Sequence, residues 1–426
     1  MAILVLLQGF NPLPNYVVAK YLAKHDQDLL GEKLDEIIVF YSKQTRHNNS
    51  STQQYAVNLQ KLLDTPKVKV SLMPLTNINN GHTIRSEVER ALQDLIAKQS
   101  IVHLNYTGGT KATGIHSYMT IRTMCESYHA RFTASYLDDR QHMLYWDNNL
   151  QIQSVNDLSL TITEFLSLHC YEDRRPSGAN DEFGENIPNS AALMQHLLSL
   201  WRYDRANYCK LQNVISGLYR RNDGYVKAAN DLQANFSAMQ HNIDDIWPIL
   251  EPVGLSTLRQ LKASVQGHEL SKKLSIKDDL KIVQFIRGFW FECYVKQELQ
   301  NAAPDDMPLT AQTFGRSLTV SRGSEKQFEL DLYLIRGYQL IGISVTTDDT
   351  ETLCKTKGFE VIHRTRQIGG DGRMAFLVTL LPDKKRDHIQ EELKSDTDIS
   401  ERFRVFGESD LNDIGSKIVR ALNSYE

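Results

Sequence analysis

Short apolar runs alternate with amphipathic stretches along the first third of the chain. Each run is long enough for one buried strand, and each stretch repeats apolar residues at the spacing of a helix. We predict strands at 3–7, 36–41, 68–73 and 101–104, helices at 15–22, 53–63, 83–98 and 112–124, and a closing hairpin at 132–136 and 142–145. This alternation is typical of a mostly parallel sheet with helices on both faces. Residues 1–150 are therefore expected to form one α/β domain.

The pattern changes after that domain. A connector at 151–188 holds a strand-like segment and then a stretch rich in Arg, Pro, Gly, Asp and Asn. Residues 189–268 keep helical periodicity, with Ser190 as a candidate N-cap, and carry neither a glycine turn nor a carboxylate pair. We interpret them as a helical spacer or a dimer contact, with a DNA-reading winged helix as the alternative. The remaining segments are a second α/β domain at 269–385 and a charged tail at 386–426 that ends in a short helix.

Composition narrows the class of protein. The 426 residues carry a formal net charge of -4, so contact with nucleic acid has to come from a local basic surface. The five cysteines are scattered without a Cys-x-x-Cys pair, which argues against zinc or a disulfide framework and for a reducing cytoplasm. No apolar run approaches the ~18 residues that a membrane helix needs. The apolar start lacks a basic region and a cleavage site, so we interpret it as a strand and not as a signal peptide.

The most specific chemical signal is the heptapeptide Asn-Tyr-Thr-Gly-Gly-Thr-Lys, which joins a predicted strand to a predicted helix. Backbone N–H groups at such a turn lack helical partners, and the helix dipole adds positive potential. Gly108 and Gly109 allow a ligand to approach the backbone closely. Thr107 and Thr110 add hydroxyl groups, and Lys111 adds a positive charge. We predict a phosphate-binding turn that is not a Walker loop, because the spacing Gly-x4-Gly-Lys is absent.

Ligands of open α/β sheets bind beyond the carboxyl ends of the strands. Two predicted loops qualify, at 8–14 after the first strand and at 105–111 after a later one. The Tyr-Ser-Lys segment at 41–43, after the second strand, is a third candidate. These loops are therefore the candidates for ligand contact in the first domain.

The second α/β domain carries candidate carboxylates. A helix is predicted at 280–299, and Glu292 lies at the edge of its apolar stripe. Gly288, one turn below, leaves space beside that carboxylate. Glu292 is therefore a candidate metal ligand.

Two predicted strands within 328–346 form a hairpin whose polar side chains are the other candidates. Period-two alternation puts Glu329 and Asp331 on one face, and Ser344 and Thr346 share one face of the returning strand. We expect the hairpin to bring these four side chains together. Carboxylates that converge from a helix and a strand hold Mg²⁺ or Mn²⁺, which position water for attack on a phosphodiester.

A capped helix is predicted at 350–367, closed by Gly369 and Gly370. Its basic residues are candidates for contact with the phosphate backbone of a nucleic acid. They are Lys355, Lys357, Arg364 and Arg366.

Together the two α/β patterns resemble the CARF–nuclease effectors of type III CRISPR systems, in which a CARF sensor is fused to a PD-(D/E)XK nuclease domain. The resemblance covers residues 1–147 and 270–385. It rests on NYTGGTK in the first half and on GFWFE, FELDLYLI and FEVIHRTRQIGG in the second. It implies a Rossmann-like CARF domain at 1–150 and a restriction-endonuclease-like α/β domain at 269–385.

Several properties are implied by the resemblance alone. CARF domains pair into homodimers and bind a cyclic oligoadenylate across the two-fold axis, and the bound ring reorders the nuclease dimer. The activator would be such a ring, the nuclease cofactor Mg²⁺ or Mn²⁺, and the substrate RNA or DNA. The matching ligand-binding residues are Gln8, Gly9, Phe10, Asn11, Asn105, Thr107, Gly108, Gly109, Thr110 and Lys111.

The nuclease motif is incomplete. The strand aspartate and the helix glutamate of the family match Asp331 and Glu292, whereas Ser-Val-Thr at 344–346 replaces the expected Glu-x-Lys. Groups from other positions could fill both missing roles, because catalysis depends on where a charge lies and not on its place in the sequence. The candidate metal ligands are Glu292, Asp331 and Glu329. The candidate catalytic residues are Glu292, Asp331, Ser344, Thr346, Lys355 and Lys357.

Three functions are consistent with these observations. The first is a metal-dependent nuclease that a cyclic oligoadenylate activates allosterically. The second is a cyclic oligoadenylate sensor whose inactive nuclease-like domain binds nucleic acid or a partner protein. The third is a ring nuclease that degrades its own cyclic ligand in the CARF pocket.

Overall fold

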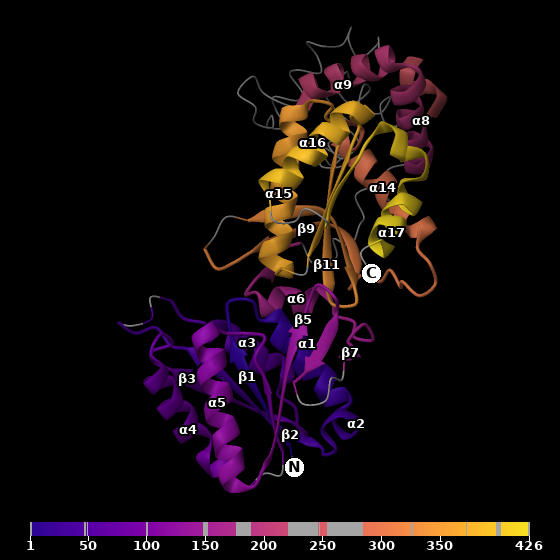
Figure 1. The fold of residues 1–426 in the computed structure, drawn as a ribbon. Helices are drawn as coiled ribbons and strands as arrows, with labels where there is room; N and C mark the ends of the chain where they lie inside the picture. The colour runs from indigo at the N-terminus through magenta and orange to yellow at the C-terminus, as the bar shows by residue number, and fades with distance from the viewer. Residues whose placement is uncertain are drawn as a thin grey trace, which may run out of the picture.

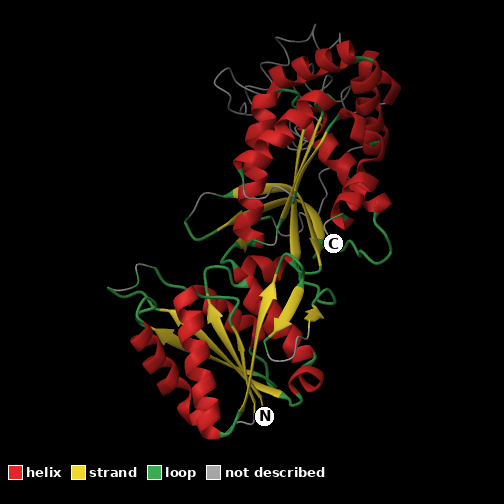
Figure 2. Cartoon of the chain, in the orientation of Figure 1, coloured by secondary structure: helices red, strands yellow, loops and turns green. Residues whose placement is uncertain are grey.

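Two β-sheets, one in each half of the chain, organise the fold in this computed structural model (Figure 1, Figure 2). The first sheet and the helices around it form the N-terminal unit, and the second sheet with its helices forms the C-terminal unit. The structure describes residues 2–46, 48, 50–98, 101–147, 152–175, 189–219, 246, 248–253, 284–324, 327–371, 373–397 and 402–424.

The elements of the N-terminal unit follow one another as the sequence predicts. Its strands are β1 (Ala2–Gln8), β2 (Leu34–Ser42), β3 (Lys69–Leu75), β4 (Ile101–Asn105), β5 (Arg131–Asp138), β6 (Met143–Trp146) and β7 (Ile152–Ser154). Its helices are α1 (Leu13–Lys24), α2 (Asp26–Leu30), α3 (Gln53–Leu63), α4 (Gly81–Ile96), α5 (Lys111–Tyr128) and α6 (Ile162–Leu168). Each strand and helix predicted for residues 1–147 is present, and α2 is an addition.

The first sheet has the strand order β3-β2-β1-β4-β5-β6-β7. Strands β1 to β5 are parallel, and β6 and β7 run antiparallel. Helices α1 and α3 pack on the face that carries Leu4 and Leu6, and α4 and α5 pack on the face of Val5 and Leu7. Because both faces are covered, β1 is buried along its whole length. The predicted mostly parallel sheet with helices on both faces is confirmed.

The order of these strands creates one crevice at the sheet edge. The chain proceeds outward in one direction from β1 to β3 and in the other from β4 to β5, so the direction reverses between β1 and β4. The loops that follow these two neighbouring parallel strands leave the same edge of the sheet. Such a reversal point is where open α/β sheets bind ligands. The fold therefore places the loops at 8–14 and 105–111 together.

The C-terminal unit combines a helical segment with a second α/β arrangement. Its strands are β8 (Glu172–Asp173), β9 (Phe314–Ser321), β10 (Phe328–Arg336), β11 (Gln339–Thr346), β12 (Met374–Thr379) and β13 (Phe403–Phe406). Its helical elements are α8 (Ser190–Tyr203), α9 (Arg205–Tyr219), η1 (Glu251–Val253), the π-helical turn η3 (Phe285–Phe289), α14 (Trp290–Ala302), α15 (Glu351–Gly369), α16 (Asp383–Asp396), η4 (Glu408–Asp413) and α17 (Ile414–Asn423). Most of the predicted helical region after 219 lies outside the described residues. None of the described helices combines the length and the apolar character that crossing a membrane requires.

The second sheet has the strand order β13-β12-β11-β10-β9-β8. Strands β11, β12 and β13 are parallel, and the other pairs are antiparallel. Helices α14 and α17 pack on one face, and α15 and α16 pack on the other. The predicted α/β character of this half and the hairpin of β10 and β11 are confirmed.

Three segments of the C-terminal unit differ from the sequence expectation. Strand β8 belongs to the predicted connector but pairs with β9, so the connector enters the second sheet. Strand β13 and helix α16 belong to the predicted charged tail, yet β13 pairs with β12 and completes the sheet. The tail is thus part of the domain, because described apolar residues such as Ile389, Leu393 and Phe403 are buried in the core. Strand β9 is not predicted, since Gly315 and Arg316 interrupt its apolar alternation.

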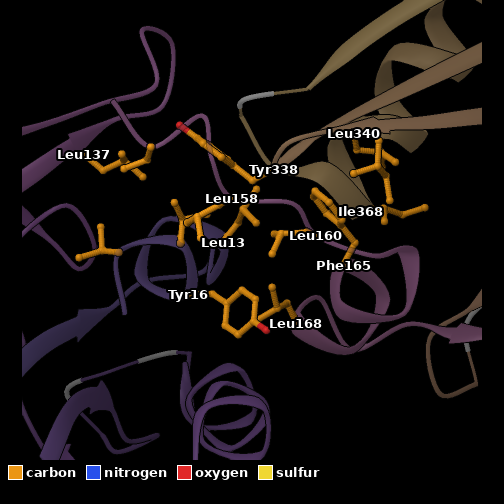
Figure 3. Packing of buried hydrophobic residues seen from close by; sticks show 14 of the residues in the cluster. Leu13, Tyr16, Leu137, Leu158, Leu160, Phe165, Leu168, Tyr338, Leu340 and Ile368 are labelled. Carbon is orange, nitrogen blue, oxygen red and sulfur yellow. The ribbon is translucent and has the colours of Figure 1, made fainter. Parts of the chain in front are cut away.

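The two units share one apolar core at their junction (Figure 3). Helix α6 and the segment before it lie between the units, and Leu160 N–H donates to the Gly337 carbonyl at 2.8 Å. Each large apolar side chain fully buried there contributes about 1.5–3 kcal/mol. The core therefore fixes the C-terminal unit against the N-terminal unit. Its members include Leu13, Tyr16, Leu158, Leu160, Phe165, Tyr338, Leu340 and Ile368.

Candidate functional sites

The diglycine turn joins β4 to α5 and lies against the end of β1. Gly109 has a φ of 79°, which a residue with a side chain rarely adopts. A Cβ atom on Gly108 would lie 2.0 Å from the carbonyl oxygen of Leu7, so only glycine permits this close approach. None of the described residues accepts a hydrogen bond from the backbone N–H of Gly108 or Gly109. The turn therefore leaves backbone N–H donors available, and anion binding there stays a prediction.

The polar side chains of the heptapeptide hold the shape of the turn. Thr110 is the N-cap of α5, and its hydroxyl accepts from Thr113 N–H at 3.2 Å. The Thr107 hydroxyl accepts from Leu137 N–H at 2.7 Å, which ties the turn to β5. Asn105 is fully buried and donates to backbone and hydroxyl oxygens of β5. These three residues position the glycine N–H groups through hydrogen bonds within the protein.

The remaining predicted ligand residues divide into buried and exposed ones. Gln8 is buried and receives a hydrogen bond from Asn15 Nδ2 at 3.0 Å, so it supports the loop after β1. Asn11 Oδ1 accepts from Leu13 N–H at 3.2 Å at the start of α1. Phe10 is 58% exposed, and Lys111 is exposed in the first turn of α5. Lys111 stands outside the set of residues that line the adjacent cavity.

A cavity of about 610 Å³ adjoins the diglycine turn and is bounded by both units. Gly9, Asn11 and Gly108 line it from the N-terminal unit, and Arg366 and Arg402 line it from the C-terminal unit. Arg366, a candidate for contact with the backbone of a nucleic acid, lies at the end of α15, in the lining of the cavity that also contains the diglycine turn. The C-terminal unit therefore contributes cations to a cavity that the sequence pattern assigns to the N-terminal domain alone.

A second, smaller cavity of about 110 Å³ lies on the other side of Gly109. Its lining is mainly apolar and includes Phe10 and Tyr41, together with the hydroxyl residues Ser42 and Thr52. Residues 41 and 42 belong to the third candidate loop. All three candidate loops of the N-terminal unit thus meet around the diglycine turn.

The predicted carboxylates of the C-terminal unit meet at another cavity, of about 620 Å³. Asp331 of β10, Glu292 of α14, Thr346 of β11 and Lys357 of α15 line it. The Asp331 carboxylate accepts two hydrogen bonds at 2.8 Å, from the Ser344 hydroxyl and from the N–H of the residue after it. These two hydrogen bonds, both from residues of β11, fix the orientation of the carboxylate. The predicted convergence of the hairpin with the helix carboxylate is present.

Glu292 is a buried carboxylate without a hydrogen bond to one of its oxygens. It lies one turn after the π-helical turn η3, and a Cβ added to Gly288 there would meet nothing within 4 Å. Among the described residues, none hydrogen-bonds to Glu292 Oε2, and Arg316 Nη1 is 3.8 Å from it. Burial, and next the Asp331 charge, raise the pKa of Glu292 well above its usual range. Arg316 and Lys357 act in the opposite direction.

The structure separates the remaining catalytic candidates. Ser344 is buried and acts on Asp331, and Glu329 is exposed and does not line the cavity. Lys355 also lies outside the lining, because its ammonium group is held 3.2 Å from Glu392 and 3.4 Å from an aspartate of α16. Of the two lysines considered for the missing cation, only Lys357 lines the cavity among the described residues.

Two parts of this second site have no counterpart in the sequence analysis. Arg316 lies on the unpredicted strand β9, and its guanidinium is 4% exposed beside Glu292. Helices α8 and α9 form one wall, where Arg205 pairs with Asp349 across the cavity at 2.8 Å and contacts the ring of Trp201. The sequence signal for α9 was only its polar face, which also fits solvent exposure. Its place beside the carboxylates is decided by tertiary contacts, such as Gln212 Nε2 to the Ile286 carbonyl at 2.8 Å.

The oxygen ligands at this cavity fit a divalent cation such as Mg²⁺ that also binds water or substrate. No group of three His, Cys, Asp or Glu side chains suited to a metal occurs in the described part of the chain. Mg²⁺ is usually bound by one or two carboxylates and completes its shell with water and substrate phosphate. Asp331 and Glu292 supply those two carboxylates, and Glu292 Oε2 has no hydrogen-bond partner among the described residues. The residues present therefore fit Mg²⁺ or Mn²⁺.

Neither a known family model nor a curated protein matches this chain. Two solved structures share its fold at low sequence identity. The crystal structure of protein VC1899 from Vibrio cholerae superposes with a TM-score of 0.63 at 17% identity, covering 100% of this chain and 98% of that one. The structure of Can2 from Sulfobacillus thermosulfidooxidans, in complex with cyclic tetra-adenylate, gives a TM-score of 0.58 at 14% identity, with coverage of 100% and 99%. Both units and their order are thus shared, which confirms the predicted two-part α/β fold.

Proposed function

We propose that this chain is a metal-dependent nuclease of type III CRISPR defence that a cyclic oligoadenylate activates. One observation supports the proposal: this chain shares, over its full length, the fold of Can2, which was solved with cyclic tetra-adenylate, and its own diglycine turn lines a cavity. The free N–H groups of that turn suit the phosphodiester groups of such a ring. The small apolar cavity beside Gly109 suits an adenine base.

The N-terminal unit presents a surface on which two copies would pair. Ile115 and Met119 lie on one side of α5 and are 59% and 56% exposed. Apolar side chains grouped in this way favour burial in an interface. A homodimer across α5 would bring two diglycine turns to a symmetric ring, with one turn for each half of the ligand.

At the second cavity, the chain's own residues would bind and orient a phosphodiester. Asp331 is held in one orientation by β11, and Glu292 adds a second carboxylate from α14. The chemistry that a bound Mg²⁺ or Mn²⁺ supplies is Lewis-acid stabilisation of the charge that develops on the phosphate. Lys357 would contribute a positive charge from α15, in place of the lysine absent from β11. Trp201 and Arg205 on the opposite wall suit a base and a backbone phosphate of the substrate.

A panel of activators and substrates tests this function. The protein is incubated with cyclic tri-, tetra- and hexa-adenylate in turn, with Mn²⁺ or Mg²⁺, and with labelled RNA and DNA in single- and double-stranded form. We expect cleavage that requires one of the rings and that chelation with EDTA stops. Cleavage at the same rate without any ring would contradict the sensor role.

The two lysines of α15 give a matched pair of variants. Lys357→Ala should lower the rate of cleavage by about tenfold to a hundredfold, because a charge close to the reacting phosphate is lost. Lys355→Ala should retain the wild-type rate, since this side chain pairs with α16 outside the cavity. Single-turnover cleavage assays with saturating activator measure both. Equal rates for the two variants would show that Lys357 is not the missing cation.

A second candidate function is a sensor whose nuclease-like domain binds nucleic acid without cleaving it. The observation that favours it is the Ser344 hydroxyl at the position of a metal carboxylate, where it occupies an oxygen of Asp331. If the wild-type chain binds a ring but cleaves nothing, Ser344→Glu combined with Thr346→Lys should create ring-dependent cleavage. The same assay with the single variants shows whether both groups are needed.

A further inference from the structure

The cavity at the diglycine turn has a second wall that comes from the C-terminal unit. Arg366 at the end of α15, Arg373 at the start of β12 and Arg402 before β13 all line it. Arg140, in the turn between β5 and β6, lies there as well. These residues are far apart in the sequence, and the packing of α15 and the second sheet against the first unit brings them together (Figure 1).

The charge of the whole cavity lining, which both units supply, is positive. Among the described lining residues, four arginines accompany two aspartates, Asp139 and Asp371, so two positive charges are in excess. Asp371 gathers the arginines: its carboxylate lies 3.3 Å from Arg366 and 3.6 Å from Arg373, and its carbonyl accepts from Arg402 at 3.5 Å. Arg373 is itself buried, with a relative exposure of 4%. Planar guanidinium groups held around one carboxylate are arranged to take phosphate oxygens in two-point contacts.

The distance between this wall and the glycine turn is fixed by packing. Gly370 has a φ of 67° and touches Asn11, since an added Cβ would lie 2.6 Å from its Nδ2. Ile368, on the last turn of α15, belongs to the apolar core that both units share (Figure 3). The end of α15 is thus locked onto the loop after β1. The arginines face the glycine N–H groups across the cavity in a defined geometry.

We propose that Arg366, Arg373 and Arg402 form the second half of the phosphate-binding site, so that the C-terminal unit is itself part of the sensor. This inference rests on the proposed function, because it takes the phosphodiester groups of a cyclic oligoadenylate as the ligand. The glycine turn binds these groups through backbone N–H donors, and the arginine wall binds them through guanidinium groups. Both units therefore contact one ligand.

This arrangement couples the two cavities through one rigid element. Arg366 and Lys357 belong to the same helix, nine residues and about 14 Å apart along its axis. A ligand that contacts Arg366 acts on α15 directly, and α15 carries Lys357 in the wall of the cavity that holds Asp331 and Glu292. Activation then needs no separate transmitting segment between the sensor and the nuclease.

Charge-removing variants of Arg366 and Arg402, which are less buried than Arg373, test the inference. The full chain with Arg366→Gln, with Arg402→Gln and with both is titrated calorimetrically with cyclic tetra- and hexa-adenylate. Arg420→Gln is the matched control, because Arg420 is an exposed arginine of the same unit that pairs with Asp413 away from the cavity. Each cavity variant should bind the preferred ring about tenfold more weakly, and the double variant about a hundredfold more weakly, as expected for lost charged hydrogen bonds. The control should bind like the wild type.

Salt dependence and thermal unfolding complete the test. The double variant should show a shallower loss of affinity with rising salt than the wild type, because fewer cations contact phosphate. Wild-type affinity in all variants, with or without a lower melting temperature, would overturn the inference and leave the proposed function standing. Failure of the wild-type chain to bind any ring would instead overturn the proposed function, and the inference with it.

Discussion

Replacing Asp331 with asparagine should lower ring-dependent cleavage at least about a hundredfold. Mutating a residue that only hydrogen-bonds to a metal ligand lowers activity by about 10–100-fold. Asp331 is proposed as a metal ligand itself, so its loss should have at least this effect. Asparagine is chosen because its carbonyl oxygen can still accept from the Ser344 hydroxyl and the Val345 N–H, as the carboxylate does at 2.8 Å. The change therefore removes the charge and keeps the hairpin. Single-turnover cleavage of labelled RNA and DNA measures the effect.

Two controls separate a lost metal ligand from a damaged fold. Asp306→Asn makes the same chemical change at an exposed loop position outside both large cavities and should keep the wild-type rate. Calorimetric titration should show unchanged affinity of Asp331→Asn for the cyclic oligoadenylate, because the two cavities have no lining residue in common. Undiminished cleavage by Asp331→Asn would place the catalytic centre elsewhere in the molecule.

Replacing Gly108 with alanine should abolish ring binding. The added Cβ would lie 2.0 Å from the Leu7 carbonyl oxygen and 3.0 Å from the Asn15 amide, so the turn has to move away from β1. Once the turn is displaced, its N–H groups can no longer donate to the phosphate groups of the ring. The strain also lowers the free energy of unfolding, by about 1–3 kcal/mol as for other overpacked sites. Calorimetric titration and thermal unfolding follow the two effects.

Gly114 supplies the matched control for this change. It lies in the first turn of α5, where an added Cβ would meet nothing within 4 Å. Gly114→Ala should therefore bind the ring normally and raise stability by up to about 1 kcal/mol, since alanine favours a helix interior more than glycine does. Ring binding by Gly108→Ala with wild-type affinity would refute the assignment of the turn.

Local patterns in the sequence predicted the elements of the N-terminal unit well. Helices cover both faces of the sheet, so its strands are buried on both sides and have to be apolar along their length. The apolar runs in the sequence therefore identify the strands. The diglycine turn could be recognised for a similar reason. The close approach of residue 108 to Leu7 and the positive φ of residue 109 both require glycine. Two adjacent glycines between a strand and a helix can be recognised in the sequence. Strand β9 left no such mark, because Gly315 and Arg316 break its alternation.

Side-chain contacts between segments far apart in the sequence could not be predicted from the local pattern. Lys355 and Lys357 are equivalent in the sequence, and only the packing of α15 shows that Lys355 faces an acidic neighbour on α16 and Lys357 the cavity lined by Asp331 and Glu292. Arg316 became a partner of Glu292 through the pairing of β9 with β10. The charged tail became the edge of a sheet for the same reason, through the pairing of β13 with β12.

The sequence by itself determined the two α/β units, the diglycine turn between β4 and α5 and the carboxylates at Asp331 and Glu292, because each depends on residues close together in the chain or on a simple periodicity. The tertiary structure alone decided that Arg366, Arg373 and Arg402 line the same cavity as the glycine turn. Long-range packing sets that juxtaposition, since the free energy of the shared core depends on buried area and not on the order of residues along the chain.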